Sequence, residues 1–341
     1  MSATSTIEPT TADDVAAALA DLRAEARPVE ISGGGSVLGR LPASDAPLLS
    51  VAGLRGIVAH AADDLTITVR AGTPLTELAA ELADAGQECP IEPVGGLGST
   101  VGGRIATALA GPRQLGAGRV RDWLLRARFV TGDGRQATAG GVTVKDVTGY
   151  DLCRLVTGSW GTIAVLTEVT LKLRPIPRHR AWYVTDRPRH DLDRVLFRPA
   201  GLFTGPDRTW ALLEGHPDDA ADQAALAGLV PADGAPDLPA RARAALDPAA
   251  LDEFVAEIAP LGLQWVAQDG VGVVHLDGGA PALASAREAA VRRGGSLLVL
   301  DPSLGLPAFG PGPGRGDDAM TERVRSALDP DGLLAPWRWT R

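Results

Sequence analysis

Three short clusters rich in glycine, serine and threonine lie in the first half of the chain and carry its clearest chemical signal. They are Ser32, Gly33, Gly34, Gly35 and Ser36; Pro93, Gly95, Gly96, Gly98, Ser99, Thr100, Gly102 and Gly103; and Gly158, Ser159, Gly161 and Thr162. Glycine exposes backbone N–H groups without an obstructing Cβ, and the hydroxyls add donors, so such loops suit a diphosphate or the carbonyl edge of a flavin. One such cluster alone is often a tight turn, but three in one half of the chain favour a shared ligand.

Motifs that would signal other chemistry are missing from the sequence. There is no phosphate-binding P-loop, no His-Glu-x-x-His and no Gly-x-Ser-x-Gly turn. Gly96 and Gly98 are followed by a glycine at 102 rather than at 101, so the nicotinamide-binding Rossmann pattern is not matched. Cys89 and Cys153 are the only cysteines, which excludes a disulfide framework and an iron–sulfur cluster within this chain, since a cluster needs about four thiolates.

The elements that must position the clusters are mixed strands and helices. Alternating or apolar runs predict strands at 29–31, 48–51, 57–59, 66–70, 123–130 and 162–173, with a hairpin turn at 132–134. Helices are predicted from Thr11, with Val15, Leu19 and Leu22 on the apolar face, and from Pro74, as first helical residue, to Gly86. Each cluster therefore follows or precedes a strand.

The composition changes after Pro175 and Pro177, which form a stiff connector. Beyond it we expect helical structure over 218–259, strands at 265–276 and 297–300, and helices over 280–293 and 321–328, with no internal repeat. The run from Gly310 to Gly316 predicts a linker. The sequence thus predicts an α+β protein with domains at 1–177 and 178–305, followed by a linker and C-terminal return segment at 306–341.

Length and charge limit the classes of function. A chain of 341 residues can form two domains with sizeable cores, and its net charge of −9 argues against nucleic acid as a partner. The polar, acidic N-terminus does not look like a signal or transit peptide, and no apolar stretch approaches 18 residues. We therefore expect a cytoplasmic protein without direct membrane insertion.

The order and content of the clusters resemble flavoproteins of the vanillyl-alcohol-oxidase type, which have a PCMH-type FAD-binding domain, and among them the FAD-binding subunits of glycolate oxidases. The segments that carry the resemblance are residues 31–39, 93–103, Gly111-Pro112-Arg113, Val120-Arg121-Asp122, 145–152, 158–162 and 171–175. They are dense from residue 31 to 175, about half of the chain.

The resemblance implies an FAD-binding domain of two α+β subdomains followed by a smaller α+β cap domain. Residues 33–36 would wrap the diphosphate, residues 95–103 would line the diphosphate and isoalloxazine, and residues 158–162 would support the adenosine or flavin side. Some relatives tether the flavin through a histidine, but none of the three clusters contains histidine or cysteine. The expected cofactor is therefore non-covalent FAD.

Two departures from the family pattern concern the cap and the C-terminus. Larger relatives carry a metal-binding motif of which only His275 remains here, and a lone histidine on an alternating strand is more often packed or exposed than a ligand. We therefore predict no metal site. Asp329 and Pro330 fit the closing motif, but Ala335 replaces its usual asparagine and cannot steady the flavin edge with a side-chain amide.

Oxidation of a 2-hydroxy acid requires a cation for the carboxylate, a base for the hydroxyl proton and the flavin as hydride acceptor. Arg113, Arg119 and Arg121 lie near the predicted flavin loops and are candidates for the cation, although arginines on such loops more often pair with acidic residues or with the diphosphate. No catalytic base stands out.

The resemblance implies an FAD-binding oxidoreductase subunit that takes part in the oxidation of a small hydroxy acid of the glycolate or D-lactate type. Electrons would pass to a partner, with a second flavoprotein subunit and an iron–sulfur subunit expected. Two alternatives stay open. One is a stand-alone FAD-dependent alcohol or hydroxy-acid oxidase or dehydrogenase, and the other is a redox-inactive flavin-fold assembly subunit.

Overall fold

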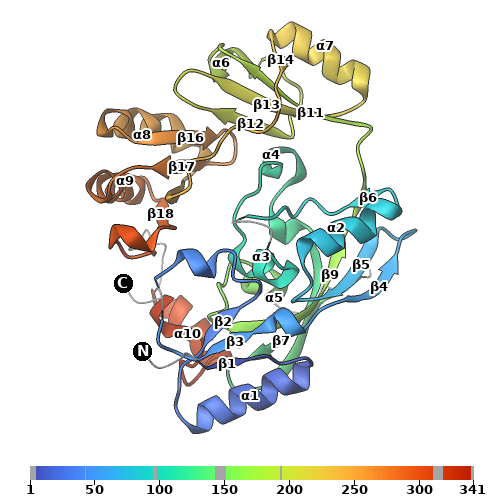
Figure 1. Ribbon diagram of the computed structural model, residues 1–341, viewed down its shortest axis with the longest axis vertical. Helices are drawn as coiled ribbons and strands as arrows, with labels where there is room; N and C mark the ends of the chain where they lie inside the picture. The colour runs from blue at the N-terminus through green and yellow to red at the C-terminus, as the bar shows by residue number, and fades with distance from the viewer. Residues whose placement is uncertain are drawn as a thin grey trace.

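The computed structural model describes residues 5–42, 44–94, 98–142, 151–192, 194–309 and 318–338. The described chain forms two parts, an N-terminal unit at the bottom of Figure 1 and an eight-stranded unit at its top. Gly95, Gly96, the segment from Lys145 to Tyr150 and the predicted linker from Gly310 to Gly316 lie outside the described residues.

The N-terminal unit begins with a small parallel sheet. Its strands β1 (Thr6–Ile7), β3 (Leu48–Ser50) and β2 (Glu30–Ser32) lie in the order β1-β3-β2. Helix α1 (Ala12–Ala24) starts with a capping box, because the Thr11 hydroxyl accepts from the Asp14 N–H and the Asp14 carboxylate accepts from the Thr11 N–H. The predicted helix from Thr11 is confirmed, and its apolar residues are buried against β2 and β3.

A five-stranded antiparallel sheet forms the rest of the N-terminal unit. Its order is β4 (Ile57–Ala61), β5 (Thr66–Arg70), β9 (Ala164–Lys172), β7 (Leu124–Thr131) and β8 (Gln136–Gly140). The helices are α2 (Leu75–Asp84), α3 (Val101–Thr107), α4 (Gln114–Ala117) and α5 (Leu152–Val156). Apolar residues of α2 and α3 pack on β5 and β9 in one core. Pro74 precedes α2 instead of opening it, because its ψ of 141° is extended.

The eight-stranded unit is one antiparallel sheet in the order β14-β11-β13-β12-β16-β17-β15-β18. The strands are β11 (His179–Thr185), β12 (Gly201–Thr204), β13 (Thr209–Gly215), β14 (Val230–Pro231), β15 (Ala242–Ala245), β16 (Gln264–Gln268), β17 (Val273–Asp277) and β18 (Ser296–Val299). The helices are α6 (Arg189–Leu192), α7 (Pro217–Ala227), α8 (Leu251–Ile258) and α9 (Ala280–Arg292). Two consecutive βαββαβ halves therefore lie side by side, joined where β12 pairs with β16. The topology repeats although the sequence showed no repeat.

Two predictions for this unit are wrong. The region 218–259 is not wholly helical, because β15 lies within it as an inner strand between β17 and β18. Ala242 and Ala244 face the core under α8 and α9, so packing overrides the low strand propensity of alanine. The predicted strand at 265–276 is a hairpin of β16 and β17, and Gly270 and Gly272 take positive φ angles in its turn.

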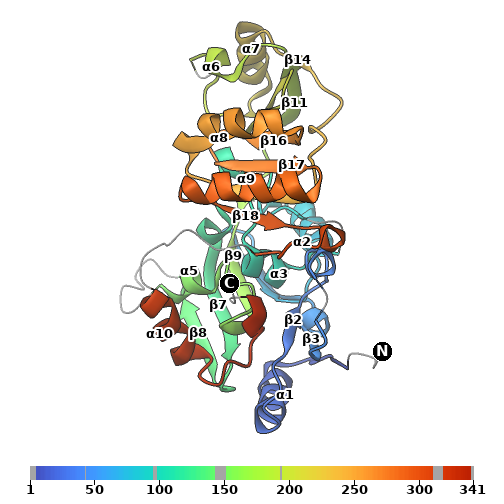
Figure 2. The same ribbon diagram turned by 90° about the vertical axis from the view of Figure 1, so that its left-hand side faces the viewer.

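The C-terminal segment returns to the N-terminal unit. Helix α10 (Asp318–Leu328) ends beside the β7–β8 hairpin, where the Gly132 N–H donates to the Leu328 carbonyl (Figure 2). The Asp329 carboxylate accepts from the N–H groups of Leu333 and Leu334, each at 2.9 Å. The 3₁₀ turn η7 (Pro336–Arg338) thereby comes to lie next to β2.

Within the described ranges, no helix is long and apolar enough to cross a membrane. The cytoplasmic location stays a prediction of the sequence.

Candidate functional site

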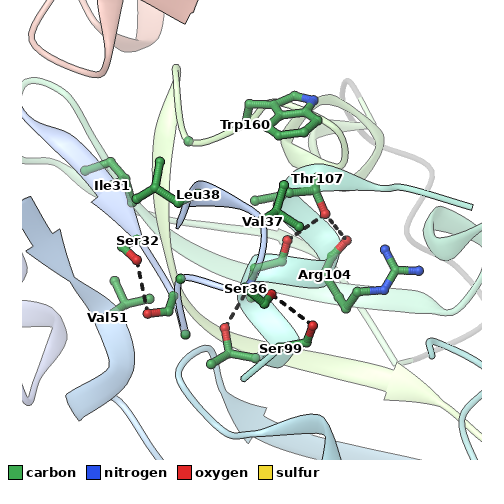
Figure 3. A pocket seen from close by; sticks show the side chains of 18 of the residues that line it. Ile31, Ser32, Ser36, Val37, Leu38, Val51, Ser99, Arg104, Thr107 and Trp160 are labelled. Carbon is green, nitrogen blue, oxygen red and sulfur yellow. Dashed lines mark hydrogen bonds between the residues drawn. The ribbon is translucent and has the colours of Figure 1, made fainter. Parts of the chain in front are cut away.

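A cleft in the N-terminal unit lies where two of the predicted clusters meet and the third closes one end. Including its open mouth, the cleft encloses about 740 Å³. The lining residues are Ile31, Ser32, Gly33, Gly34, Gly35, Ser36, Val37, Leu38, Leu41, Val51, Val94, Ser99, Thr100, Gly102, Gly103, Arg104, Ala106, Thr107, Trp160, Gly161, Ala164, Leu166 and Arg338. Figure 3 shows the Ser36 and Ser99 hydroxyls meeting on one side and the Trp160 indole on another.

The first two clusters pack backbone against backbone, which explains why their glycines carry no side chain. A Cβ on Gly34 would lie 1.6 Å from the Gly98 carbonyl oxygen, and one on Gly33 would lie 2.3 Å from the Thr100 hydroxyl oxygen. The two clusters are also joined by a hydrogen bond of 3.0 Å between the Ser36 and Ser99 hydroxyls. Gly33 and Gly34 therefore shape the cleft by allowing the two loops to approach each other.

Gly35 plays a different part from its neighbours. Its φ of +73° lies in the left-handed region, and a Cβ there would meet nothing within 4 Å. At this position the backbone can turn toward the cleft with its N–H groups uncovered, as a loop that binds an anion requires.

The third cluster reaches the cleft only in part. Gly161, with a φ of +69°, packs against Ile31 and lines the cleft, as does its neighbour Trp160. The Ser159 hydroxyl instead donates to the Val156 carbonyl, and the Thr162 hydroxyl donates to the Ser159 carbonyl. Five predicted site residues thus lie outside the cleft lining, namely Pro93, Gly98, Gly158, Ser159 and Thr162.

No aspartate or glutamate is among the described residues that line the cleft. Its arginines are Arg104 on α3 and Arg338 on the C-terminal return. Arg338 is paired with Glu30 and also donates to the Trp160 carbonyl. Burial raises the pKa of Glu30, and the charge of Arg338 offsets part of this rise. The C-terminal return therefore closes one wall of the cleft.

Arg104 is almost fully buried, at 3% exposure, and only part of its guanidinium is satisfied. Its Nε donates to the Glu92 carbonyl at 2.5 Å, but its Nη1 has no partner. Burial lowers the pKa of Arg104 to about 10, opposed by the charge of Glu92. In Figure 3 the guanidinium extends from α3 away from Ser36 and Ser99. An anion is the group that such an incompletely paired cation accepts best.

The arginines considered for carboxylate binding do not form one site. Arg113 is 6% exposed and lies in an ion-pair network, with its Nε 2.7 Å from a Glu92 oxygen and its Nη1 2.8 Å from a Glu88 oxygen. Its Nε and Nη1 therefore bridge acidic residues and are occupied within the protein. Arg119 and Arg121 instead line a separate cavity next to α5.

Sequence reasoning missed a polar group on the eight-stranded unit. Arg243 on β15, Gln268 on β16 and His275 on β17 line a second cavity of about 680 Å³, mouth included. Burial, and then the charge of Arg243, lower the pKa of His275 to about 3, so this side chain is neutral at physiological pH. In the parts of the chain that the structure describes, no group of three or more His, Cys, Asp or Glu side chains could hold a metal. The sequence singled out only His275 from this group, and no motif placed Arg243 beside it.

Comparison with known proteins gives these features a family context. Residues 3–140 match a family model described as FAD binding domain. Glycolate oxidase subunit GlcE of Escherichia coli is 48% identical over 125 residues, which cover 36% of this chain and 36% of that protein. D-lactate dehydrogenase of Archaeoglobus fulgidus is 34% identical over 171 residues, covering 50% of this chain and 38% of that protein. The matches thus span less than half of the length of these relatives.

Among solved structures, alkyldihydroxyacetonephosphate synthase has the same fold. It superposes with a TM-score of 0.66 over 97% of this chain and 76% of its own, at 14% sequence identity. The predicted α+β fold class with a PCMH-type FAD-binding domain is confirmed, and so is the resemblance to glycolate oxidase subunits.

The described residues of the cleft fit FAD, independently of the comparison with known proteins. Its two facing loops have glycines where a Cβ would collide with backbone or a hydroxyl, its described lining has no acidic side chain, and it has an incompletely paired arginine. A diphosphate is suited to such loops, and a flavin ring is suited to the apolar wall that includes Val37, Leu41 and Trp160.

Proposed function

We propose that this chain, whose residues 3–140 match a family model described as FAD binding domain, takes part in the oxidation of a 2-hydroxy acid of the glycolate or D-lactate type. Relatives named as glycolate oxidase subunits and D-lactate dehydrogenases support the substrate class. The observation that carries the proposal is the cleft itself, in which two glycine-rich loops meet beside a wall of apolar residues. FAD, when bound, supplies the acceptor for a hydride from the carbon that bears the hydroxyl.

In this proposal the residues of the clusters hold the cofactor in different ways. Residues 33–36 and 99–103 would surround the diphosphate, with backbone N–H groups as donors. Trp160 and Gly161 would lie against the flavin or adenosine part. Pro93, Gly98, Gly158, Ser159 and Thr162 would support the loops from behind, because none of them lines the cleft. Gly95 and Gly96 keep their predicted role but lie outside the described residues.

FAD would be bound without a covalent link. No cysteine or histidine is among the described residues that line the cleft, and Cys89 and Cys153 lie elsewhere. Burial raises the pKa of Cys89 to about 12, so that thiol is not a nucleophile at neutral pH.

Onward electron transfer would need a partner. GlcE and GlcD are named as subunits, which supports an assembly with a second flavoprotein subunit. The chain has two cysteines, too few for an iron–sulfur cluster, so we also propose an iron–sulfur subunit as the next carrier. The division into domains at 1–177, 178–305 and 306–341 belongs to the same proposal.

A matched pair of glycine variants tests the cleft. Gly34→Ala places a methyl group against the Gly98 carbonyl, whereas Gly39→Ala lies in a nearby 3₁₀ turn, where a Cβ would meet nothing within 4 Å. We expect Gly34→Ala to weaken FAD binding at least about a hundredfold, which corresponds to a loss of about 2.7 kcal/mol, and Gly39→Ala to bind FAD like the wild type. The measurement is a fluorescence titration of the apoprotein with FAD.

The proposal is refuted if the wild type binds no FAD, and the loop assignment is refuted if Gly34→Ala binds FAD normally while folded. Acid precipitation tests the absence of a covalent link, because the flavin should stay in the supernatant. Reduction of the bound flavin by a hydroxy acid, with and without partner subunits, separates the main proposal from a stand-alone enzyme and from a redox-inactive assembly subunit.

A further inference from the structure

The two halves of the eight-stranded sheet can be compared helix by helix, because each has the order βαββαβ. Helix α6 corresponds to α8 in this order, and α7 corresponds to α9. In the second half, α8 is followed at once by the 3₁₀ turn η5 (Ala259–Leu261). In the first half, α6 has a single turn, Arg189–Leu192. Among the described residues, the first half therefore has no helix that matches the length of α8.

The shortness of α6 leaves one flank of α7 uncovered. Counted from the N-caps of the two helices, Asp219, Gln223 and Leu226 of α7 correspond to Ala282, Ala286 and Ala289 of α9. The spacing of i, i+4 and i+7 places each set on one stripe of its helix. In α9 this stripe packs into the core that α8 shares, so Ala289 is 1% exposed. Leu226, at the equivalent position of α7, is 71% exposed.

Phe197 extends this uncovered stripe from the loop that follows α6. Its N–H donates to the side-chain oxygen of Gln223 at 2.7 Å, which holds the loop against α7. Phe197 is 73% exposed, and with Leu226 it is one of the two most exposed large apolar side chains of the described chain. The next residue, Arg198, has a φ of +50°, which residues other than glycine seldom adopt. We call Asp219, Gln223, Leu226 and Phe197 the open flank.

The charge beside the open flank is negative. Asp219 and Asp222 are exposed on α7, and that helix contains no lysine or arginine. The other half shows how charge is matched between neighbouring helices, because Glu257 of α8 pairs with Arg292 and Arg293 at the end of α9. A helix that lay beside α7 as α8 lies beside α9 would therefore need basic residues to match the aspartates.

The same charge argues against a second copy of this chain as the occupant. In a two-fold contact through α7, the aspartates of one copy would face those of the other, and like charges repel. An amphipathic helix with basic residues beside an apolar stripe suits both the leucine and the aspartates. Helix α7 lies at the end of the molecule away from the N-terminal unit (Figure 1), so such a helix would leave the FAD cleft open.

We propose that the open flank is a docking surface for an amphipathic helix of another protein. Its apolar side chains would cover Phe197 and Leu226, and its lysines or arginines would lie beside Asp219 and Asp222. The docked helix would complete the first half of the sheet as α8 completes the second. That the helix belongs to another subunit of the same oxidoreductase rests on the proposed function, whereas the docking of a basic helix does not.

The test uses two synthetic peptides of about 15 residues, which is long enough for about four helical turns. Both have leucines on one face at helical spacing. One peptide has lysines beside this face, and the other has glutamates at the same positions. Binding of each labelled peptide to the full chain with FAD is measured by fluorescence anisotropy at low and at high salt.

Two variants change the open flank, and each has a matched control elsewhere. Leu226→Ser removes an apolar side chain, and Met320→Ser removes one that is 50% exposed on α10. Asp219→Lys reverses a charge, and Asp21→Lys makes the same change of net charge on α1. All four side chains are exposed, so the variants should fold and bind FAD like the wild type, and both properties are measured.

We expect the wild type to bind the lysine peptide at least about tenfold more tightly than the glutamate peptide, with a smaller preference at high salt. Leu226→Ser should weaken binding of the lysine peptide by about tenfold, because an apolar contact is lost. Asp219→Lys should weaken it by about fivefold at low salt. The two control variants should bind it like the wild type.

Three results would overturn the proposal: a wild type that does not prefer the lysine peptide, open-flank variants that bind this peptide as tightly as their controls, or a dimer in analytical ultracentrifugation that Leu226→Ser dissociates. The last would make a second copy the occupant. Failure of FAD binding or of hydroxy-acid oxidation in the wild type would instead count against the proposed function, and the peptide titration of the apoprotein would still decide the docking surface.

Discussion

Two groups of arginines lie between the same two units of this molecule, and they differ in whether acidic residues accompany them. In the first, which we call the ion-pair network, Arg113, Arg174 and Arg180 are interleaved with Glu88, Glu92 and Glu214. In the second, Arg104 and Arg243 are buried beside a neutral histidine, and neither forms an ion pair with an acidic side chain in the described chain.

The two groups join the same two units in different ways. The ion-pair network connects β6 (Gln87–Glu88) and β10 (Arg174–Pro175) of the N-terminal unit with β11 and β13 of the eight-stranded unit, and its charges cancel within the protein. Arg243 and Gln268 connect the same units through hydrogen bonds to carbonyl groups, which leaves the charge of Arg243 without an acidic partner. Uncompensated buried charge lowers stability, whereas the charges of the ion-pair network compensate one another.

The largest effect on stability is expected in the ion-pair network. Burial alone would raise the pKa of Glu88, but hydrogen bonds and charge from Arg180, Arg113 and Arg174 lower it overall. Glu88→Gln leaves these arginines partly uncompensated and should lower the free energy of unfolding by about 3 kcal/mol. The matched variant Glu77→Gln, which breaks an exposed pair with Arg55, should change it by less than about 1 kcal/mol.

The same variant predicts a pH dependence with a definite sign. A carboxyl whose pKa is lowered in the folded state stabilises the protein at pH values above 4.5, the ordinary pKa of a glutamate. This contribution is lost as the pH falls through the folded-state pKa. The difference between wild type and Glu88→Gln in urea unfolding should therefore shrink below about pH 4.5. A difference that grew toward acid pH would contradict the role given to the network.

A smaller change of opposite sign in the free energy of unfolding is expected when Arg243 is replaced. Arg243→Met replaces an unpaired buried cation by an apolar chain of similar length, so the free energy of unfolding without ligand should rise by about 1 kcal/mol. Urea unfolding of the wild type and the variant measures this change. If Arg243→Met were destabilised as much as Glu88→Gln, the difference proposed between the two groups of arginines would be wrong.

The sequence predicted the N-terminal unit well because its signals are local. The capping box at Thr11 and Asp14, the alternation over 66–70 and the hairpin turn at 132–134 each depend on neighbours in the chain. The glycine clusters were found from their composition, but composition did not reveal that Gly33 and Gly34 serve loop packing while Gly35 faces open space.

The cluster of Arg243, Gln268 and His275 could not be predicted, because it depends on pairing across the sheet. Arg243 and His275 are far apart in the chain and become neighbours only because β15 inserts between β17 and β18. The sequence Ala242-Arg243-Ala244 is as compatible with a helix as with a strand, so the decisive side chain was placed in the wrong element. Arg113 was identified as a candidate from its position near the flavin loops, although its acidic partners come from two separate segments, Glu88 and Glu92 from one and Glu214 from the other.

Anaerobic reduction of the bound flavin tests the central claim most directly. The purified chain with FAD is mixed with glycolate or D-lactate in the absence of oxygen, and the visible absorbance of the flavin is followed, with dithionite as the chemical reductant for comparison. The account predicts that one of these acids bleaches the flavin, as dithionite does. A flavin that dithionite reduces but neither acid does, alone or with partner subunits present, would contradict it.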